Sequence, residues 1–498
     1  EVKTSSAKTR LIPFSFSTEQ TYILEFGNQY IRFYKDDGQI TSGGSAYEIS
    51  SPYTTAQLFD LKFAQSADVM YICNENHPVK KLSRTGHTSW TLADVDFTDG
   101  PYLDSNTSST TMTPSGTTGS ITITASSSAF VSTDVDRFIN FSNGYAKITA
   151  FTSATVVSAT VENDFDNTNA VTDWKLGAFS TTTGFPRCVS FFEQRLVFAG
   201  TSNQPQTMFF SKSGDYENMT SGTNDDDAMI YTIASNQVNA IQALKATRTL
   251  IVMTTGGEYA VSSGASQDAI TPTNINIRKQ SNYGSSGVDA LSIGNATIFL
   301  QRARRKIREL AYNFDTDGYT APDLTILADH ISESGLTDMS YQQEPYSVVW
   351  AVRADGQMAG LTYNRLENVV AWHRHIFGGK SDTGKTVKQQ KISFTANSTN
   401  VNTTSNQITI TGHGLATGDQ VYYYAASNKI GGLSNSKVYY VIAVDANNIK
   451  LAISTANASA NTAISLTSAP GSDTTQFIYQ GVNINNNILF VSAHGFKS

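Results

Sequence analysis

Six short apolar runs recur along the first three quarters of the chain, and each is followed by a polar or glycine-bearing turn and an alternating stretch. Clear examples are "TYILEFGNQYIRFYKDDG" from Thr21 and "TLIVMTTGGEYAVSSG" from Thr249. An apolar run of about four residues predicts a buried strand, and alternation predicts a partner strand with one exposed face. Each segment therefore predicts a β-hairpin. The runs begin at Tyr22, Val69, Leu196, Leu250, Thr297 and Val348.

The spacing of these runs predicts the architecture. It is roughly 50 residues, a period typical of β-propeller blades with several strands each. The gap between Val69 and Leu196 is much longer, and it contains strand patterns of its own, such as "GSITITAS" and "YAKITAF". We therefore predict an all-β fold, a β-propeller with inserted small β domains. Tandem β-sandwiches also place short strands at such intervals and stay an alternative at this point.

The same patterns divide the chain into segments. We predict the first propeller blades over 1–103, an inserted small β domain over 104–179, and the remaining blades over 180–378. A polar linker (379–391) leads to a second β module of alternating strands and glycine turns (392–480), and 481–498 begins a further strand segment. Helix signals are scarce. The best candidate is "DDDAMIYTIASNQVNAIQAL" from Asp225, although its β-branched residues suit a strand and a turn equally well.

Composition narrows the functional classes. Only 15% of the 498 residues are charged, against about 25% in an ordinary domain. The net charge of −7 argues against a dedicated high-affinity DNA-binding protein, which normally has a basic surface. No stretch approaches about 18 uninterrupted apolar residues, so we expect no membrane span. Cys73 and Cys188 match no metal or redox spacing, and a disulfide between them stays open.

Several short motifs resemble catalytic or metal sites. Gly379–Thr386 matches the phosphate-binding pattern G-x-x-x-x-G-K-[ST], but that site needs a strand before it and a helix after it. The following "VKQQKISFTAN" is short and strand-like, so we attribute the match to chance. His373 and His375 alternate along a strand and share one face, but two ligands without a third make a weak metal site.

Acidic residues are the remaining candidates. A glycosidase needs two carboxylates at a fixed separation, and nothing in the spacing of Asp225, Asp226, Asp227 and Glu258 selects a pair. The sialidase hairpin signature has its nearest counterpart in "SRTGHTSW" (Ser83–Trp90), which lacks the aspartate. The Asp225–Asp227 run also lacks the spacing of an EF-hand calcium loop. We predict no catalytic, cofactor-binding or metal-binding residues, and no cofactor.

The most basic stretch is "LQRARRKIRELAY" (Leu300–Tyr312). Alone it could be a nucleic-acid-binding helix, but a helix would have to begin directly after the apolar run without a cap residue. In register with the other hairpins, its turn falls at Ala303–Lys306, and the rest is a strand. Clustered cations suit a subunit contact or a transient phosphate contact at the rim of a channel. The candidate residues are Arg302, Arg304, Arg305, Lys306 and Arg308.

Long strings in this sequence resemble one protein family. They include "RLIPFSFSTEQTYILEFGNQYIRFYKDDGQI", "FPRCVSFFEQRLVFAGTSNQPQTMFFSKSGDYENM" and "MSYQQEPYSVVWAVRADGQMAGLTYNRLENVVAWHRH". They are similar to the tail nozzle family of short-tailed phages, also called tail tubular protein B, over about residues 1–378. The resemblance implies a virion structural protein, not an enzyme. It also implies that this sequence is part of a longer chain.

The family implies a propeller subunit that forms a homohexamer, assembled in the host cytoplasm and located in the virion tail. The ring would surround the DNA-ejection channel, contact the tail adaptor ring and the tail fibres, and meet phage genomic DNA only in transit. Residues 392–480 depart from the family pattern. They resemble an FCCH-like β module of phage proteins, whose role the sequence leaves open. The alternative function is a phage glycan-binding or glycan-degrading propeller protein.

Overall fold

The computed structural model describes residues 2–481, apart from gaps at 5–6, 18–19, 37, 236–238, 265–267, 316, 376–390, 426–427, 436 and 472–473. The chain divides into two compact units, one over Arg10–Leu327 and one that contains Ala328 and the residues after it. This division falls inside the range 180–378, which we predicted to hold the remaining blades. Each unit is described by itself.

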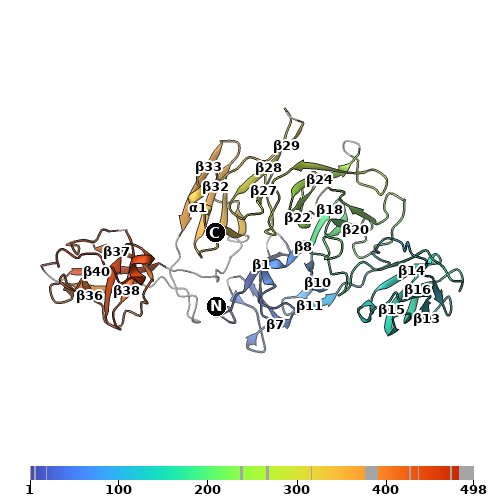
Figure 1. Ribbon diagram of the computed structural model, residues 1–498, viewed down its shortest axis with the longest axis horizontal. Helices are drawn as coiled ribbons and strands as arrows, with labels where there is room; N and C mark the ends of the chain where they lie inside the picture. Colours follow the sequence, from blue (N-terminus) through green and yellow to red (C-terminus); the bar gives the residue numbers. More distant parts are fainter. Residues whose placement is uncertain are drawn as a thin grey trace. The chain divides into compact units, whose positions relative to one another are not determined.

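Five antiparallel sheets of four or five successive strands lie in the first unit, besides a two-stranded sheet of β5 (Thr41–Ser42) and β6 (Ser45–Ala46) and a six-stranded sheet described below (Figure 1). The first sheet contains β1 (Arg10–Ser15), β2 (Thr21–Gly27), β3 (Tyr30–Lys35) and β4 (Gly38–Gln39), and β7 (Glu48–Ser50) also pairs with β3. The second sheet contains β8 (Lys62–Ser66), β9 (Val69–Asn74), β10 (His77–Gly86) and β11 (Ser89–Asp94). The third sheet contains β18 (Cys188–Phe192), β19 (Arg195–Ala199), β20 (Thr207–Phe210) and β21 (Met229–Thr232). The other two are β22 (Ile241–Ala246), β23 (Leu250–Thr254), β24 (Gly257–Ser263) and β25 (Ile275–Ser281); and β26 (Leu291–Ile293), β27 (Ala296–Leu300), β28 (Ile307–Asn313) and β29 (Gly318–Thr320).

The second unit begins with α1 (Asp329–Ser332) and a sixth sheet of the same kind: β30 (Leu336–Gln342), β31 (Val348–Arg353), β32 (Met358–Asn364) and β33 (Val369–His375). Four-stranded antiparallel meanders of consecutive strands are propeller blades. A sandwich would instead connect strands of two packed sheets through Greek-key crossovers. The predicted fold class, an all-β β-propeller with inserted β domains, is confirmed.

Each of the six predicted apolar runs forms the second strand of one sheet: β2, β9, β19, β23, β27 and β31. Every residue of β19, β23 and β27 is buried. A strand that is covered on both faces needs apolar residues throughout, which is why these strands read as continuous runs and not as alternation. The run that begins at Leu196, for example, places Leu196, Val197 and Phe198 in the core at 0% exposure.

A six-stranded antiparallel sheet lies between the second and third blades in the sequence. Its strands are β12 (Met112–Pro114), β13 (Ser120–Ala125), β14 (Phe138–Phe141), β15 (Gly144–Ser153), β16 (Val156–Asn163) and β17 (Trp174–Leu176), in the spatial order β12-β13-β16-β15-β14-β17. Phe141 and Phe165 stack at its core, with their ring centroids 4.3 Å apart. All six strands fall within 104–179, the range of the predicted insertion.

A seven-stranded sheet follows the sixth blade in the sequence. It contains β34 (Lys391–Ala396), β35 (Val401–Asn402), β36 (Gln407–Thr409), β37 (Gln420–Ala425), β38 (Val438–Ala443), β39 (Asn448–Ala452) and β40 (Thr474–Gly481), and α2 (Thr455–Ser459) follows β39. Its core includes Ile408, Val421 and Tyr423, each fully buried. The predicted linker up to residue 390, and the strand segment predicted after Gly481, lie outside the described residues.

The segment that begins at Asp225 is not a helix. It forms a turn, then β21, and after an undescribed gap β22. The strand-and-turn alternative is therefore correct. None of the described helices has the length and apolar composition that a membrane span requires.

Candidate functional site

The basic stretch forms a β-hairpin, as its register predicted. β27 ends at Leu300 and pairs with Ile307 at the start of β28. The turn is closed by a hydrogen bond from the Gln301 amide to the Lys306 carbonyl (2.9 Å) and another from the Arg304 amide to the Gln301 carbonyl (2.7 Å). Arg304 has a positive φ, a left-handed conformation that continues a turn but not a helix. The helical alternative is excluded.

Two of the five candidate cations are held by the blade itself. The Arg308 guanidinium lies 3.5 Å from the centroid of the Tyr283 ring and donates to Gln301 Oε1 (2.9 Å) and to the Ala321 carbonyl (2.7 Å). Arg308 is only 9% exposed. It is therefore a structural residue of the blade, which corrects its assignment to a contact surface. Lys306 Nζ lies 2.7 Å from Asp323 Oδ2.

The environment of Asp323 keeps its carboxyl group charged and so stabilises the ion pair with Lys306. Burial raises the pKa of the Asp323 carboxyl, but hydrogen bonds from Lys306 and Thr325 outweigh burial and hold the pKa below its ordinary value. The carboxylate thus stays charged and keeps Lys306 at the base of the turn. Lys306 is less available to an outside partner than the sequence indicated.

The side chains of Arg302, Arg304 and Arg305 are exposed at the turn. Arg302 is anchored to the preceding blade: its amide donates to the Gly284 carbonyl (3.0 Å), and its guanidinium lies 3.4 Å from the Thr255 carbonyl. Within the described part of the chain, no ion pair or side-chain hydrogen bond is found for Arg304 or Arg305. Of the five predicted contact residues, these three arginines form the exposed cationic surface, and we call them the basic turn.

A cluster of charges lies in the interior of the first unit, where the first strands of successive sheets contact one another (β8 with β18, β18 with β22). Lys62 Nζ of β8 lies 2.6 Å from Asp289 Oδ1 and 2.5 Å from the Gly287 carbonyl, both in the loop before β26. Arg10 of β1 reaches the same carboxylate at 3.6 Å and donates to the Leu58 and Leu61 carbonyls. The cluster connects the first, second and fifth sheets.

Asp289 is charged in this setting. Its side chain is 46% accessible, yet the surrounding protein desolvates the carboxyl, which raises its pKa. The positive charges of Lys62 and Arg10 outweigh this effect and hold the pKa of Asp289 below its ordinary value. Lys245 of β22 also acts on Asp289, and desolvation lowers the pKa of its ammonium group. Sequence reasoning missed this cluster, because its members are isolated residues far apart in the chain.

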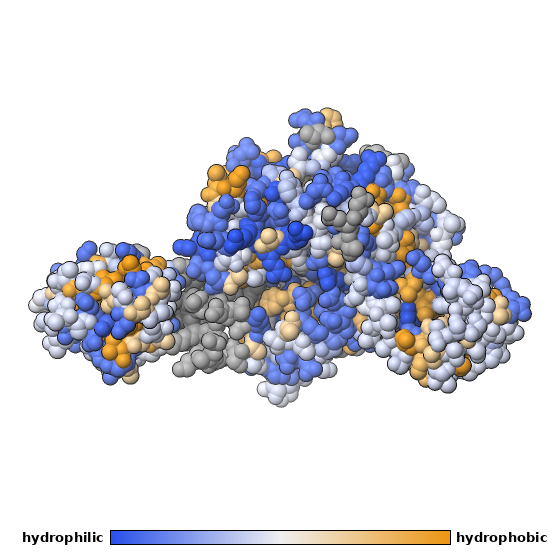
Figure 2. All heavy atoms as spheres, viewed as in Figure 1, coloured by the Kyte–Doolittle hydropathy of each residue, from blue (hydrophilic) through white to orange (hydrophobic). Residues whose placement is uncertain are grey.

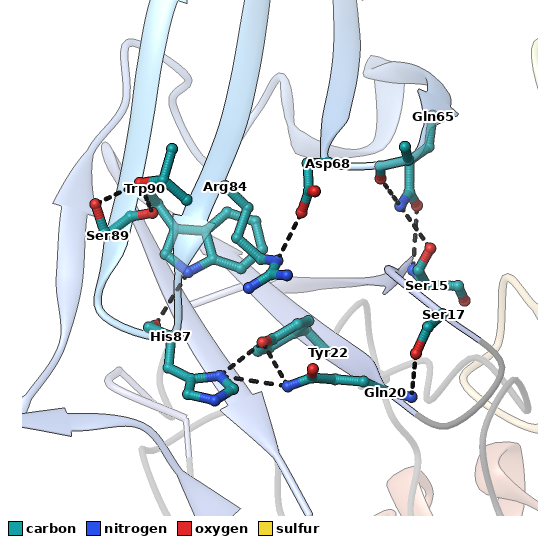
Figure 3. A network of polar contacts seen from close by, with 12 residues as sticks. Ser15, Ser17, Gln20, Tyr22, Gln65, Asp68, Arg84, His87, Ser89 and Trp90 are labelled. Carbon is teal, nitrogen blue, oxygen red and sulfur yellow. Dashed lines mark hydrogen bonds and ion pairs between the residues drawn. The ribbon is translucent and has the colours of Figure 1, made fainter.

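A polar and aromatic seam joins the first two blades (Figure 3). The Arg84 side chain pairs with Asp68 (2.9 Å) and covers the Phe16 ring at 3.9 Å. The Tyr22 hydroxyl lies 2.7 Å from His87 Nδ1. These contacts involve the stretch Ser83–Trp90, the counterpart of the sialidase signature. Here that stretch forms the β10–β11 hairpin and packs one blade against another.

The backbone of the acidic run Asp225–Asp227 accepts hydrogen bonds from a buried arginine. Arg195 is 2% exposed, and its guanidinium donates to the carbonyls of Asp225 (2.5 Å), Asp227 (2.7 Å) and Ser211 (2.8 Å). The Asp227 carboxylate pairs with Lys212 at 3.2 Å. The run is therefore a structural turn.

The remaining candidates also have structural partners. Glu258 is fully buried and accepts hydrogen bonds from the hydroxyls of Ser281 and Ser285. His373 Nδ1 and His375 Nε2 lie 2.6 Å apart on β33, on one face as predicted. No group of three metal-ligating side chains is present among the described residues. Cys73 and Cys188 are buried free thiols. The phosphate-binding motif Gly379–Thr386 lies outside the described residues.

Comparison with known proteins gives no family. No protein-family model and no curated protein matches the chain. Among solved structures, it is similar to the Swd1 (Cps50) β-propeller domain of Myceliophthora thermophila, with 7% identity and a TM-score of 0.35 over 72% of this chain and 98% of that one. It is also similar to a protein from Lactobacillus plantarum, with 11% identity and a TM-score of 0.32 over 94% and 99%. A third is BamB from Moraxella catarrhalis, with 11% identity and a TM-score of 0.27 over 84% and 94%.

These similarities are too low to bear on function. The blade assignment rests on the strand order of the sheets, which the structure gives directly.

Proposed function

We propose that this protein is a virion structural protein, a tail nozzle subunit that forms a homohexameric ring around the DNA-ejection channel of a short-tailed phage. The proposal rests on the resemblance of the long strings quoted above to the tail nozzle family, together with the propeller fold that this family implies. Its partners would be further copies of itself, the tail adaptor ring, the tail fibres, and genomic DNA in transit.

One structural observation carries the proposal further. The interior of the first unit is crossed by the Arg10–Asp289–Lys62 cluster, with Lys62 Nζ only 2.6 Å from the carboxylate. A DNA duplex, whose major groove alone is about 12 Å wide, does not fit through a space that side chains bridge in this way. A conduit for DNA built from this protein would therefore have to be enclosed by several copies, as in a ring.

The charge distribution agrees with a conduit. Each protein–phosphate contact adds a salt-dependent attraction that would slow the passage of DNA. The chain carries a net charge of −7, and three of the five clustered cations predicted as contacts stay exposed. A net negative charge favours transient contact with DNA over tight binding.

Negative-stain imaging and native mass spectrometry of the natural full-length protein test the proposal. We expect closed rings with six-fold symmetry and a mass six times that of one chain. A protein that stays monomeric at micromolar concentrations, with or without purified adaptor protein, would exclude the nozzle role.

The glycan-binding alternative has one observation in its favour. A cavity of about 490 Å³ opens where β8, β18 and β22 end, and Phe191, Tyr216, Gln65 and Arg248 are among its lining residues. Aromatic rings beside amides and a guanidinium suit a saccharide. Glu193 is the one carboxylate among the lining residues, and it accepts a hydrogen bond from the Ile270 amide (2.6 Å). Since glycosidases use a pair of carboxylates, this cavity supports binding more than cleavage. Binding of the protein to a glycan array tests this alternative. If the protein binds none of the glycans on the array, the alternative is excluded.

A further inference from the structure

The fifth blade has an exposed aromatic hairpin at the end opposite to the basic turn. β28 and β29 are joined by a hairpin that projects beyond the neighbouring strands (Figure 1). Phe314 is 87% exposed there and Tyr312 48%. In the space-filling view, this projection carries apolar residues beside hydrophilic ones (Figure 2). Asp315 and Asp317 are also exposed in it, and we call these four residues the tip.

Local contacts hold the tip in place. The Tyr312 hydroxyl donates to Asp317 Oδ1 (2.6 Å), and the Tyr312 and Tyr319 rings meet edge to face at 5.8 Å. The Asp315 amide donates to Asn313 Oδ1 (2.8 Å). The hairpin therefore presents Phe314 from an ordered base. The tip therefore offers an exposed phenyl ring and two exposed carboxylates together.

The tip and the basic turn cannot meet within one blade. The turn precedes β28 and the tip follows it, and β28 is a strand of 7 residues. An extended strand of that length holds its two ends on the order of 20 Å apart. The two surfaces are complementary: one carries three arginines, and the other carries two carboxylates and an exposed phenyl ring. A guanidinium over such a ring gains a cation–π interaction in addition to the ion pair.

We propose that the tip of one copy docks on the basic turn of the next copy. Two different surfaces at opposite ends of one blade make a heterologous contact, and such a contact produces a ring when its rotation closes. A second copy accounts for both surfaces at once, whereas DNA would account for the arginines but would be repelled by Asp315 and Asp317. The inference rests on the proposed ring and names the surfaces that build it.

Charge-reversal variants of the natural full-length protein test this contact. R304E/R305E alters the turn, and F314S/D315K alters the tip. The matched controls are K429E, which reverses an exposed cation in the connection between β37 and β38, and L366S, which removes an exposed apolar side chain of the β32–β33 turn. Each variant is first compared with the wild type by circular dichroism and thermal unfolding, and all should fold, because every altered side chain is exposed.

We expect native mass spectrometry to show rings for the wild type and both controls, and at least a tenfold loss of rings for the two interface variants. A mixture of R304E/R305E with F314S/D315K should then recover assembly, because each variant keeps the surface that the other has lost and the reversed charges of the two altered surfaces attract each other. Rings formed by R304E/R305E at the wild-type level would overturn this contact and leave the nozzle proposal standing. A wild type that forms no ring would overturn both.

Discussion

Lys62 Nζ lies 2.6 Å from Asp289 Oδ1, although Lys62 belongs to the second sheet and Asp289 to the loop before the fifth sheet of the same unit. Every blade of that unit is built from consecutive strands, so no strand is exchanged between its early and late sheets in the described residues. Side chains must then supply part of the connection between them. Lys62 is 7% exposed and has the Gly287 carbonyl as its other acceptor, which makes it a buried cation that depends on Asp289.

Replacing Asp289 by Asn should destabilise the first unit. Lys62 and Arg10 would lose their counter-charge while they stay buried, and leaving a buried donor poorly satisfied costs about 1–3 kcal/mol. We expect a loss of that size in the free energy of unfolding, measured by urea denaturation. Asp60→Asn, at an exposed position in the 3-10 helix Leu58–Asp60, is the matched control and should have almost no effect. Equal stability of the two variants would show that the cluster is not a structural tie.

The ion pairs of Asp289 with Lys62 and of Asp323 with Lys306 predict a pH dependence of stability. The pKa values of Asp289 and Asp323 lie below their ordinary value of 3.8 in the folded protein, so the unfolded chain binds more protons in acid. Their stabilising contribution is complete well above pH 3.8 and is lost as the pH falls through the lower folded values. The free energy of unfolding, measured between pH 6 and pH 3, should therefore decrease in acid. The decrease should be smaller in Asp289→Asn, and an identical slope in this variant would contradict the assignment.

Two arginines of the basic stretch should differ sharply in their effect on stability. Arg308→Met keeps the apolar stem but leaves Gln301 Oε1 and the Ala321 carbonyl without their donor, at a cost of about 1–3 kcal/mol. Arg305→Met alters an exposed side chain and should stay within about 0.5 kcal/mol of the wild type. Chemical denaturation of both variants measures this difference. A similar loss of stability in both variants would contradict the assignment of Arg308 to the blade interior and of Arg305 to the exposed turn.

The strands that the sequence predicted best are those that are buried on both faces, because their burial appears in the sequence as a continuous apolar run. Leu196 and Leu250 begin runs covered on both faces. Every side chain there has to be apolar, so the second strand of each blade was visible in the pattern alone. The hairpin at the basic stretch was predictable for the same reason, because the run before it set the position of its turn.

The charged interior was not predictable, because its partners are set by the tertiary fold. Arg195 follows a glutamine in a turn and reads as a surface residue, yet four backbone carbonyls accept hydrogen bonds from it. The three acids of Asp225–Asp227 resemble a helix N-terminus, but the backbone carbonyls of all three accept hydrogen bonds from Arg195 in place of helical amides. Arg308 is followed by Glu309, so its position in the sequence gives no sign that its side chain is buried. Its burial depends on the Tyr283 ring and the Ala321 carbonyl, which the tertiary fold brings next to it.

The two thiols allow a direct test of the packing of the first unit's core, since Cys73 lies between the second and third sheets and Cys188 in the cluster of the third and fourth. Burial raises the pKa of Cys73, and it raises the pKa of Cys188 to about 12 despite the nearby charges of Lys62 and Arg187. Because the thiolate is the reactive form, neither cysteine should react with an aromatic disulfide reagent at pH 8 while the protein is folded. Both should react at once in denaturant. Thr88→Cys, at an exposed turn, provides the control and should react within seconds in the native protein. Full reaction of the native wild type at the control rate would show that this core opens far more readily than its packing implies.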